Sequence, residues 1–464
     1  MKNIVLILMT MFLLVSCDDD FATGSDAQPV ASTDTLHLGT LLADNSSPTY
    51  QLKLYNPNSK ELKLTSIVLR NAPASGFRMN VDGMNGTSFA NSDLLRISSG
   101  DSLFMFVEAT FPQKGLGTQR HLDYVDVLCN GKTTTIVLDA VSKDVRRLQG
   151  YTVTTNEVWD KAGEIQIYDS LVIAEGVVLT LTDSTTLYLH DKANIIVYGS
   201  LKAQGTITRP VTIRGDRTDN MFDNLPYDNL PSQWGSLYMR RQSRGNSFEY
   251  ANIRGMSDGI WVESEADFTN CRIKNSDGNL ITAVDARTRF ENCELSNAAG
   301  SLLDIVGGES AVVHCTLANY NFAASITQEA LRLSNRDTLN NVSVPLLQCD
   351  FVNTIIWGRK FCPDICLDYH RPEQGDSIFN YRFDHCLIHA DGTDDEQFVG
   401  TLWNTEPGFL LIDDKNYTYD FHLTEESAAK GAGTTDNASS QRSDIDGKEW
   451  QNPPSIGCYE WNDN

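Results

Sequence analysis

Two groups of arginines are the first residues whose type and spacing could do chemistry. Arg240 and Arg241 stand together, and Arg287 and Arg289 follow further along the chain. A lyase that acts on acidic polysaccharides needs a lysine or arginine base beside a cation that neutralises the sugar carboxylate. If these arginines meet on one face, they form a basic stripe suited to such a substrate. The competing interpretation, which we favour, is that they are solvated charges on surface turns.

A second set of residues could bind sugars without cleaving them. Trp357, Tyr369 and His370 lie in one long segment, and Trp403 follows it. Exposed aromatic rings present flat apolar faces with polar tips, which suits a sugar-binding platform. These four residues are therefore candidate ligand-binding residues. The alternative is that the rings simply pack against the surrounding β-structure.

Metal ligands are present only in incomplete sets. Cys362, Cys366 and His370 supply at most three zinc ligands, whereas a structural zinc site needs four. We favour a local disulfide between Cys362 and Cys366. The acidic run 391–396 lacks the spacing of a calcium-binding EF-hand loop and is more typical of a solvated turn. We therefore predict neither a metal nor a cofactor.

One short segment resembles fragments of polygalacturonases. Arg272-Ile273-Lys274 is followed by Asn-Ser-Asp-Gly at 275–278. In that family the Asn-Thr-Asp segment comes first, and an Asp pair and a Gly-His-Gly separate it from Arg-Ile-Lys. Here the order is reversed, and Gly-His-Gly is absent from the sequence. We interpret the match as a coincidence, with Arg272 as an outward residue of a repeat and 275–278 as a turn.

The composition limits the range of partners. The chain has 464 residues, with 61 acidic against 37 basic side chains and a formal net charge of −24. Nucleic acids and anionic lipid headgroups attract positive surfaces, so neither is an expected partner. The length exceeds that of one ordinary domain and indicates several units or a repeat array.

The first residues predict the compartment. Lys2 precedes an apolar stretch, 4–15, that is too short to span a bilayer. Leu14-Val15-Ser16-Cys17 resembles the lipobox of bacterial lipoproteins, which implies removal of residues 1–16 and lipidation of Cys17. An ordinary secretory signal with an incidental cysteine is the alternative.

The residues after Cys17 predict where the protein faces. An acidic run resembles the surface-export signal of Bacteroidota lipoproteins, and it consists of Asp18, Asp19 and Asp20. The resemblance implies attachment to the outer membrane through the lipid, with the protein facing the cell exterior. Residues 17–32 have the composition of a flexible tether.

Short alternating strands fill the next segment, 33–145. Tyr50–Leu54 and Leu103–Val107 are examples, and about seven such strands fit an immunoglobulin-like β-sandwich. The stretch from Ile97 to Ser102, followed by Phe111-Pro112 and Gly115, resembles bacterial immunoglobulin-like domains of the ASH type. That resemblance implies a spacer or an adhesive unit.

A repeat of the form apolar-x-polar-small-x-apolar dominates the following segment. Its six copies begin at Phe248, Phe268, Phe290, Val312, Leu346 and Phe383. Three steps are close to 22 residues, which suits one coil of a parallel β-helix with equivalent residues stacked about 4.8 Å apart. The last two steps are longer and leave room for loops.

Cysteine usually occupies the small position of this repeat. We predict a buried ladder of free thiols formed by Cys271, Cys293, Cys315, Cys349 and Cys386. A corner must precede each cysteine, and Asn270 and Asn292 suit that corner because asparagine tolerates left-handed backbone. A chain of disulfides is the competing interpretation, but parallel inward side chains fit the required dihedral poorly.

Two further segments support the same architecture. Gly-Ser-Leu-Lys-Ala-Gln-Gly at 199–205 and Trp-Gly-Ser-Leu at 234–237 resemble the entry coils of bacterial right-handed β-helix repeat proteins. Asp-Ile-Asp-Gly at 444–447 and Ile-Gly-Cys-Tyr-Glu at 456–460 resemble the terminal segment of choice-of-anchor Q surface proteins. We expect this terminal segment to cap the open end of the helix.

The predicted fold class is all-β: a β-sandwich at 33–145, a right-handed parallel β-helix at 146–405 and a C-terminal capping segment at 406–464.

The predicted function is that of a non-catalytic, surface-exposed outer-membrane lipoprotein that acts as a glycan- or protein-binding scaffold. As a protein-binding scaffold it would be an accessory subunit of an outer-membrane assembly. A β-helical polysaccharide lyase or glycoside hydrolase is the alternative. An enzyme should show two carboxylates, or a carboxylate and a lysine or arginine, converging in one cleft. A binding module should show exposed aromatic rings without such a pair.

Overall fold

The computed structural model describes residues 21–461 apart from 91–92, 116, 161–163, 223, 373–376 and 437–439. The predicted signal peptide and the predicted lipidation site Cys17, with Asp18, Asp19 and Asp20, lie outside the described residues. The chain divides between Asp144 and Val145 into two compact units, each with its own core. Within the described part of the chain, no helix has the length and apolar character needed to cross a membrane.

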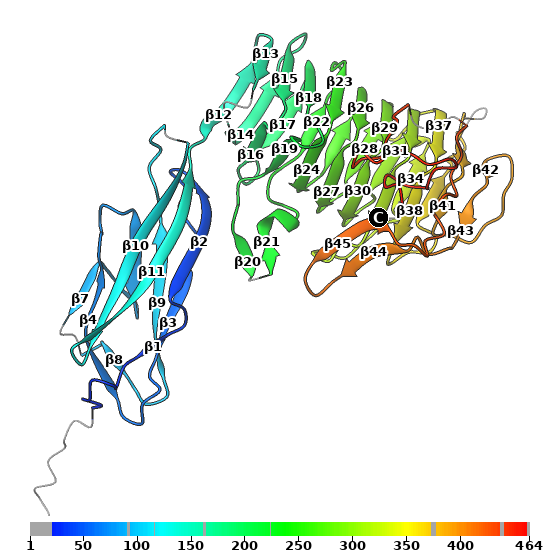
Figure 1. Ribbon diagram of the computed structural model, residues 1–464. Coiled ribbons are helices and arrows are strands. Elements are labelled where there is room, and N and C mark those ends of the chain that lie inside the picture. The colour runs from blue at the N-terminus through cyan, green and yellow to red at the C-terminus, as the bar shows by residue number, and fades with distance from the viewer. Residues whose placement is uncertain are drawn as a thin grey trace, which may run out of the picture. The chain divides into compact units, whose positions relative to one another are not determined.

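The first unit is a β-sandwich of two mainly antiparallel sheets (Figure 1). One sheet runs in the order β1 (Val30–Ala31), β3 (Tyr50–Tyr55), β9 (Ser102–Ala109), β5 (Phe77–Val81) and β6 (Met84–Gly86). The other runs β2 (Thr35–Leu42), β11 (Lys132–Lys143), β10 (Thr118–Cys129), β4 (Leu62–Leu69) and β7 (Ser88–Ala90), and β8 (Arg96–Ile97) pairs with β4. Every second residue of β9 is buried, as expected for a strand with one face on a core. The predicted sandwich is confirmed.

The second unit is a parallel β-helix whose coils have three faces. Face 1 contains β13 (Glu157–Trp159), β15 (Val178–Thr182), β18 (Ser200–Gln204), β23 (Asn246–Glu249), β26 (Glu265–Thr269), β29 (Arg287–Glu291), β32 (Gly308–Val313), β37 (Leu346–Val352), β40 (Arg382–Asp384) and β42 (Phe398–Val399). Face 2 contains β16 (Thr186–Leu189), β19 (Val211–Gly215), β24 (Ala251–Met256), β27 (Arg272–Ser276), β30 (Glu294–Ala298), β33 (Thr316–Asn319), β38 (Ile355–Gly358), β41 (Leu387–Ile388) and β43 (Leu402–Trp403). Face 3 contains β17 (Asn194–Val197), β22 (Leu237–Met239), β25 (Ile260–Val262), β28 (Ile281–Val284), β31 (Leu303–Val306), β34 (Leu331–Ser334) and β39 (Ile365–Asp368).

The first coils and the excursions from the coils complete this unit. The long strands β12 (Arg146–Val153) and β14 (Ile165–Ile173) each run through faces 2 and 3, because the two ends of β14 pair with β16 and with β17. Three short hairpins leave the coils: β20 (Asn220–Phe222) with β21 (Leu225–Pro226), β35 (Arg336–Asp337) with β36 (Val342–Ser343), and β44 (Phe409–Asp413) with β45 (Thr418–Leu423). The 3-10 turn η1 (Tyr227–Asn229) follows β21. Figure 1 shows the parallel strands stacked along the unit, and the predicted fold class is confirmed.

The corner between face 1 and face 2 has the backbone that the sequence predicts. Asn270 and Asn292 have φ angles of 55° and 53°. The equivalent residues of the other repeat coils are also left-handed, and these are Tyr250, His314, Asn353 and His385. A left-handed residue turns the chain without lengthening the coil, so the residues on both sides of it point inward.

Inward residues of successive coils stack in register. Ring centroids of Phe248 and Phe268 are 4.8 Å apart, and those of Phe268 and Phe290 are 5.0 Å apart. Phe351 and Phe383 continue the row at 4.5 Å. These spacings agree with the predicted stacking, because the distance between adjacent strands sets the repeat along the core.

The cysteine ladder is confirmed at four positions and wrong at one. Cys271, Cys293, Cys315 and Cys386 are buried free thiols directly after corner residues. Cys349, also buried and free, instead pairs in β37 with Ser310 of β32. Thr354 holds the fifth place in the ladder. Phe351 pairs with Val312, which begins the preceding repeat, so the small position three residues later falls on Thr354. The sequence around Cys349 fits the repeat pattern in two overlapping frames, and the structure uses the later one.

The small residue at this position also satisfies a backbone group. The Cys271 thiol donates to the carbonyl of Phe248 at 3.3 Å, and the Cys293 thiol donates to that of Phe268 at 3.4 Å. The Thr354 hydroxyl does the same toward Val312 at 3.3 Å. Each acceptor lies in the coil before the donor. The position therefore requires a small side chain, and cysteine or threonine there adds a hydrogen bond that Ala251, in the first repeat coil, cannot make.

The C-terminal segment packs along the side of the coils, which differs from the predicted position over their open end. Gly457 donates its N–H to the carbonyl of Asn353 at 2.8 Å, and Asn292 donates to the carbonyl of Ser443 at 2.8 Å. Ile456 packs with Ile355 and Leu387, which are outward residues of face 2. The physical reason is that the last coils carry apolar side chains on their outer surface, and these require a cover.

Candidate functional site

The outward side chains of face 2 change in character along the stack. The early strands carry polar and charged side chains, namely Asn252, Arg254, Arg272, Lys274, Glu294 and Ser296. The later strands carry mainly apolar ones, and Ile355, Trp357 and Leu387 lie in one cluster under the C-terminal segment. The charged part of face 2 begins where that apolar cover ends.

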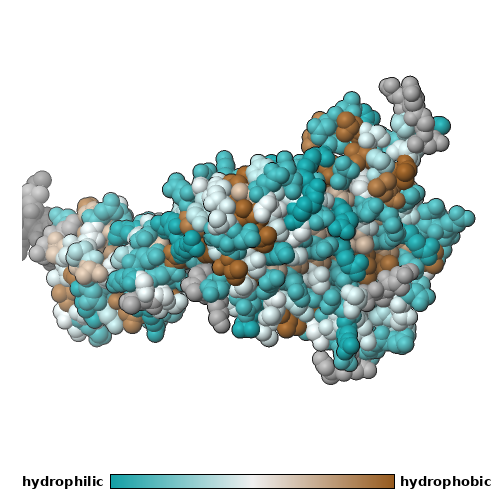
Figure 2. Space-filling view, turned by 90° about the horizontal axis from the view of Figure 1, so that it is seen from above, coloured by the Kyte–Doolittle hydropathy of each residue, from teal (hydrophilic) through white to brown (hydrophobic). Residues whose placement is uncertain are grey.

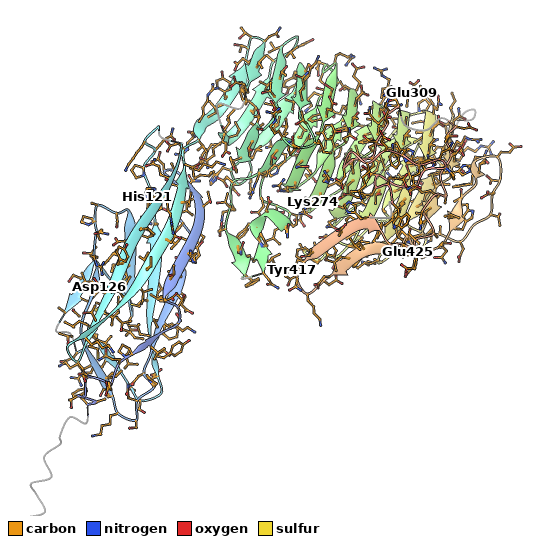
Figure 3. All side chains as sticks on the ribbon, viewed as in Figure 1. His121, Asp126, Lys274, Glu309, Tyr417 and Glu425 are labelled. Atoms are coloured by element: carbon orange, nitrogen blue, oxygen red, sulfur yellow. The ribbon has the colours of Figure 1, made fainter. Side chains whose placement is uncertain are left out.

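A hollow of about 160 Å³ lies at this boundary. We call it the face-2 hollow. Its floor consists of Lys274 and Asn275 on β27 and of residues of β30, namely Glu294, Ser296 and Asn297. Its walls are Asn229 of η1 on one side and four aromatic residues on the other, namely Phe322, Tyr417, Tyr419 and Phe421. Figure 3 labels Lys274 on the coils and Tyr417 on the hairpin formed by β44 and β45.

The hairpin turn that carries Tyr417 is held by its own side chains. Asp413 accepts hydrogen bonds from the N–H groups of Lys415 and Asn416 at 2.9 and 3.1 Å. Tyr417 has a φ of 54° and its ring centroid lies 4.4 Å from that of Phe322. Asn224, beside β21, donates to the carbonyl of Lys415 at 3.0 Å. The two hairpins on the outside of face 2 are therefore joined beside the hollow.

Lys274 is a cation without a fixed partner. Burial lowers the pKa of its amine. Its side chain makes no hydrogen bond or ion pair with any residue of the described ranges. A half-buried amine in this condition costs free energy unless a ligand pairs with it or it loses its proton.

Glu294 lies on the strand next to Lys274, and its carboxylate is already engaged. Ser296 donates to one of its oxygens at 2.9 Å, and the Tyr459 hydroxyl donates to the other at 2.5 Å. Tyr459 is buried, and burial beside Glu294 raises the pKa of its hydroxyl well above the ordinary value. Tyr459 is therefore a permanent donor to Glu294 at any physiological pH.

A chain of charged groups supports the floor from the C-terminal segment. Arg272 pairs with Asp446 at 2.5 Å, and Asp446 accepts from Nε2 of His422 at 2.6 Å. Nδ1 of His422 donates to Asp420 at 2.5 Å. A histidine that donates from both ring nitrogens is protonated, and the hydrogen bond to Asp446 raises the pKa of His422.

The opposite rim is neutralised in a similar way. Asp228 of η1 accepts from Arg254 at 2.7 Å and also pairs with Arg214 at 3.2 Å. The hydrogen bond from Arg254 lowers the pKa of Asp228, although burial acts in the other direction. Arg214, Arg254 and Arg272 thus each have a carboxylate within 4 Å, whereas Lys274 has none among the described residues.

The structure brings only some of the predicted arginines together, and it surrounds them with carboxylates. Arg241 and Arg287 line a shallow depression of about 400 Å³ with Glu265, Asp285 and Glu309, among others. Arg287 pairs with Glu265 at 2.7 Å, and Arg241 pairs with Asp285 at 3.5 Å. Figure 3 labels Glu309 at an edge of the coils well away from Lys274. The depression has mixed charge rather than a basic stripe.

The other two predicted arginines are also paired. Arg240, which follows β22, lies 3.4 Å from Glu263. Arg289 on β29 pairs with Glu291 at 2.9 Å. With these pairs, all four predicted arginines have an acidic partner.

The predicted aromatic residues do not form one platform. Trp357 is only 8% exposed, lies in the apolar cluster under the C-terminal segment and stacks on His389 at 4.2 Å. Trp403 of β43 packs on Phe398 at 4.9 Å and donates its indole N–H to Asp394. Both tryptophans belong to face 2 and serve packing.

The two remaining candidates of this set lie elsewhere, after β39 of face 3. Tyr369 is 43% exposed, and its ring lies 5.6 Å from that of Phe379. His370 pairs with Asp368 at 2.9 Å. The structure therefore separates Tyr369 and His370 from the predicted tryptophans.

The candidate disulfide is not formed in the structure. Cys362 is an exposed free thiol in the turn before β39, and Cys366 is a half-buried free thiol within that strand, level with Arg332 of β34. Strand pairing fixes the direction of Cys366 independently of Cys362. Among the described residues, no group of three or more His, Cys, Asp or Glu side chains is arranged to hold a metal ion.

Sequence reasoning missed the residues that form the face-2 hollow. Lys274 was considered only as part of a false family match. Tyr417, Tyr419 and Phe421 alternate along the chain, and this period-2 pattern is the signal that could have identified an aromatic strand face. Phe322 gives no such signal, because it lies in a loop.

Figure 2 shows a largely hydrophilic face with hydrophobic residues in small separate groups. Exposed apolar side chains on β20 and β44 are Met221, Phe222, Leu410, Leu411 and Ile412. They lie on the two hairpins that Asn224 and Lys415 join.

No protein-family model matches this chain, and no curated protein matches its sequence. Among solved structures, it is similar to an ASH/PapD-like domain of human CEP192, with a TM-score of 0.18 and 11% identity over 28% of this chain and 93% of that one. It is also similar to a family 123 glycoside hydrolase from Clostridium perfringens that hydrolyses glycolipid glycans, with a TM-score of 0.18 and 10% identity over 25% of this chain and 26% of that one. The catalytic domain of a GH87 α-1,3-glucanase, in complex with tetrasaccharides, gives a TM-score of 0.13 and 10% identity over 77% of this chain and 88% of that one.

Proposed function

We propose that the protein is a surface-displayed outer-membrane lipoprotein that binds a glycan without cleaving it. The observation that carries this proposal is the face-2 hollow, where aromatic rings face a floor of polar and charged groups. The lipobox-like sequence at Cys17 and the acidic run after it support the proposed location. In this proposal the β-sandwich acts as a spacer between the membrane and the β-helix.

The chemistry of the hollow suits a sugar ring. The flat faces of Phe322, Tyr417 and Tyr419 suit the apolar C–H face of a pyranose. Asn275 and Asn297 offer side-chain amides for hydroxyl groups, whereas the Ser296 hydroxyl already donates to Glu294. Sites for small ligands combine an apolar wall with a few polar groups in this way.

Binding is favoured over cleavage because Glu294, the only acidic side chain among the described residues that line the hollow, already has hydrogen-bond partners. Both carboxylate oxygens of Glu294 already accept a hydrogen bond, one from Ser296 and one from Tyr459. A hydrolase needs two carboxyl groups on either side of the scissile bond. Glu294 supplies one, and the described lining of the hollow offers no second.

A polysaccharide lyase is the second candidate, and a specific pair of residues favours it. Lys274 and Glu294 converge in the same hollow, which meets the criterion for an enzyme drawn from the sequence. Burial lowers the pKa of Lys274 and so favours the neutral amine, which could act as a base.

A protein partner is the remaining version of the scaffold proposal. Leu410, Leu411 and Ile412 form a run of exposed apolar residues on β44. Such a run suits docking to an outer-membrane protein. Affinity capture of the tagged chain from detergent-solubilised outer membranes would recover a stoichiometric partner in this version.

The test of glycan binding compares two tyrosine variants. Tyr417→Ala removes a wall of the hollow and should abolish retention on immobilised polysaccharides, whereas Tyr369→Ala, at an exposed site elsewhere, should leave it unchanged. Each preparation is also incubated with soluble polysaccharides and assayed for new reducing ends and for unsaturated, ultraviolet-absorbing products. Product formation by the wild type but not by Lys274→Met would replace the binding proposal with the lyase.

A further inference from the structure

We propose that the face-2 hollow selects an acidic sugar residue, whose carboxylate pairs with the Lys274 ammonium while its ring stacks on Tyr417 and Phe322. This inference rests on the proposed function, because it names the class of glycan bound at the same site. It goes further in assigning charge selection to one residue.

The pairing of the surrounding charges points to Lys274. Arg254 and Arg214 share Asp228, at 2.7 and 3.2 Å, and Arg272 pairs with Asp446 at 2.5 Å. Lys274 has no such counter-ion within the described ranges, although it lines the floor of the hollow. A ligand carboxylate beside it would complete a set in which each of these half-buried cations has an anion.

Glu294 does not take that place. Its oxygens accept from Ser296 at 2.9 Å and from Tyr459 at 2.5 Å. No ion pair within 4 Å joins it to Lys274 in the described structure. Glu294 instead attracts the positive charge of Lys274 from a distance and partly offsets burial, which lowers the pKa of the amine. The amine thus stays available to a ligand.

The overall charge of the chain limits the kind of acidic glycan that fits. The cations nearest Lys274 are Arg254 and Arg272, and each pairs with a carboxylate, Asp228 and Asp446 respectively. The chain as a whole carries a formal net charge of −24. Repulsion by the rest of the surface would weaken long polyanions, so the hollow suits single acidic residues in a mixed glycan.

The size of the hollow is that of one ring. A volume of about 160 Å³ admits on the order of ten water-sized groups. A single uronic-acid-type residue has a comparable number of heavy atoms. Lys274 lines the same volume as the aromatic residues, so the carboxylate of a ring held by them can reach it.

The test uses matched ligands that differ in the acidic group alone. The full mature chain is titrated calorimetrically with several uronic-acid-containing polysaccharides, each beside its carboxyl-reduced form, and with a sulfated neutral polysaccharide. We expect binding to at least one acidic form and a loss of affinity of about 10- to 100-fold when its carboxylate is reduced, the range of a charged hydrogen bond.

The variants test the residue assigned to the carboxylate. Lys274→Met should cause the same loss of affinity and Lys274→Arg a smaller one. Lys202→Met, on the outer surface of face 1, should cause none, and melting curves check that each variant is folded.

The outcomes separate this inference from the function on which it rests. Equal binding of the acidic and reduced forms, or equal binding by the wild type and Lys274→Met, would overturn the inference while glycan binding stands. Preference for the sulfated polysaccharide would overturn carboxylate selection. Binding to none of the polysaccharides would overturn both proposals.

Discussion

His314 is a corner residue whose protonation state the fold determines. Its Nδ1 donates to the carbonyl of Gly457 at 3.2 Å, and its Nε2 accepts from the side-chain amide of Asn353 at 2.9 Å. Both nitrogens are therefore satisfied in one neutral tautomer. A second proton would place two donors face to face in a buried site, and burial lowers the pKa of His314 to about 4.

This arrangement predicts acid lability. The pKa of His314 is lower in the folded chain than the value of about 6.5 in an unfolded chain, so the unfolded state binds more protons between these values. The stabilisation is fully present above pH 6.5 and is lost as pH falls toward 4, by up to about 3 kcal/mol in the free energy of unfolding. His314→Asn should reduce this pH dependence, because asparagine occupies the same corner in neighbouring coils. Denaturant unfolding at pH 7.0 and pH 4.5 measures both chains, and equal losses in both would contradict the assignment.

The thiol ladder makes a second prediction for a single residue. Cys293→Thr and Cys293→Val introduce side chains of nearly the same shape, but only threonine donates to the carbonyl of Phe268. We expect the threonine variant to be more stable than the valine variant by about 1 kcal/mol in the free energy of unfolding. Thr354 already fills this position in another coil. Equal stability of the two variants would show that size alone matters there.

At the scale of elements, the sequence predicts the corners and the coil length, since these depend on local backbone and on spacing. It did not predict the register of β37, because Leu346 and Phe351 can each start the repeat pattern. It also misplaced the C-terminal segment. Apolar residues at Ile355, Trp357 and Leu387 point outward from face 2, and their pattern is the signal for a covering segment.

The covering role of the C-terminal segment predicts the effect of its removal. A chain ending at Asn404 would expose Trp357 and Leu387, which are buried in the full chain. We expect binding of a hydrophobic dye such as ANS and a lower melting temperature for the β-helix. The β-sandwich has a separate core, so its transition serves as the internal control. A truncated chain that melts like the full chain and binds no dye would exclude this role.

At the scale of the whole molecule, two separate cores predict two separable unfolding transitions. Phe290 lies in the stacked core of the β-helix, and Met105 lies in the core of the β-sandwich. Phe290→Ala should destabilise the first by about 3–5 kcal/mol, and Met105→Ala should destabilise the second by about 2–5 kcal/mol. Differential scanning calorimetry should show that each variant moves only one transition. A shift of both transitions by either variant would mean that the two units unfold together.

The architecture was predictable from sequence at this scale, but the face-2 hollow was not. A repeat is visible in the sequence because each coil places similar side chains at equivalent inward positions. The hollow has no repeat, since its lining comes from η1, from β27 and β30, from the loop at Phe322 and from the last hairpin. These segments are up to 192 positions apart, from Asn229 to Phe421, and nothing local in the sequence links them.

The route of the C-terminal segment has a mechanical consequence. A solenoid normally frays from its end one coil at a time, because each coil contacts only its neighbours. Here the C-terminal segment runs along several coils and contacts each of them. Asp446 contacts β27, Tyr459 contacts β30, Cys458 contacts β33, and Ile456 contacts β38 and β41. Separating one of these coils from the stack must therefore also break its contacts with the C-terminal segment. The coils from β27 to β41 should therefore unfold as a single unit, and the coils from β12 to β17, which lie beyond the described contacts of the C-terminal segment, should open first.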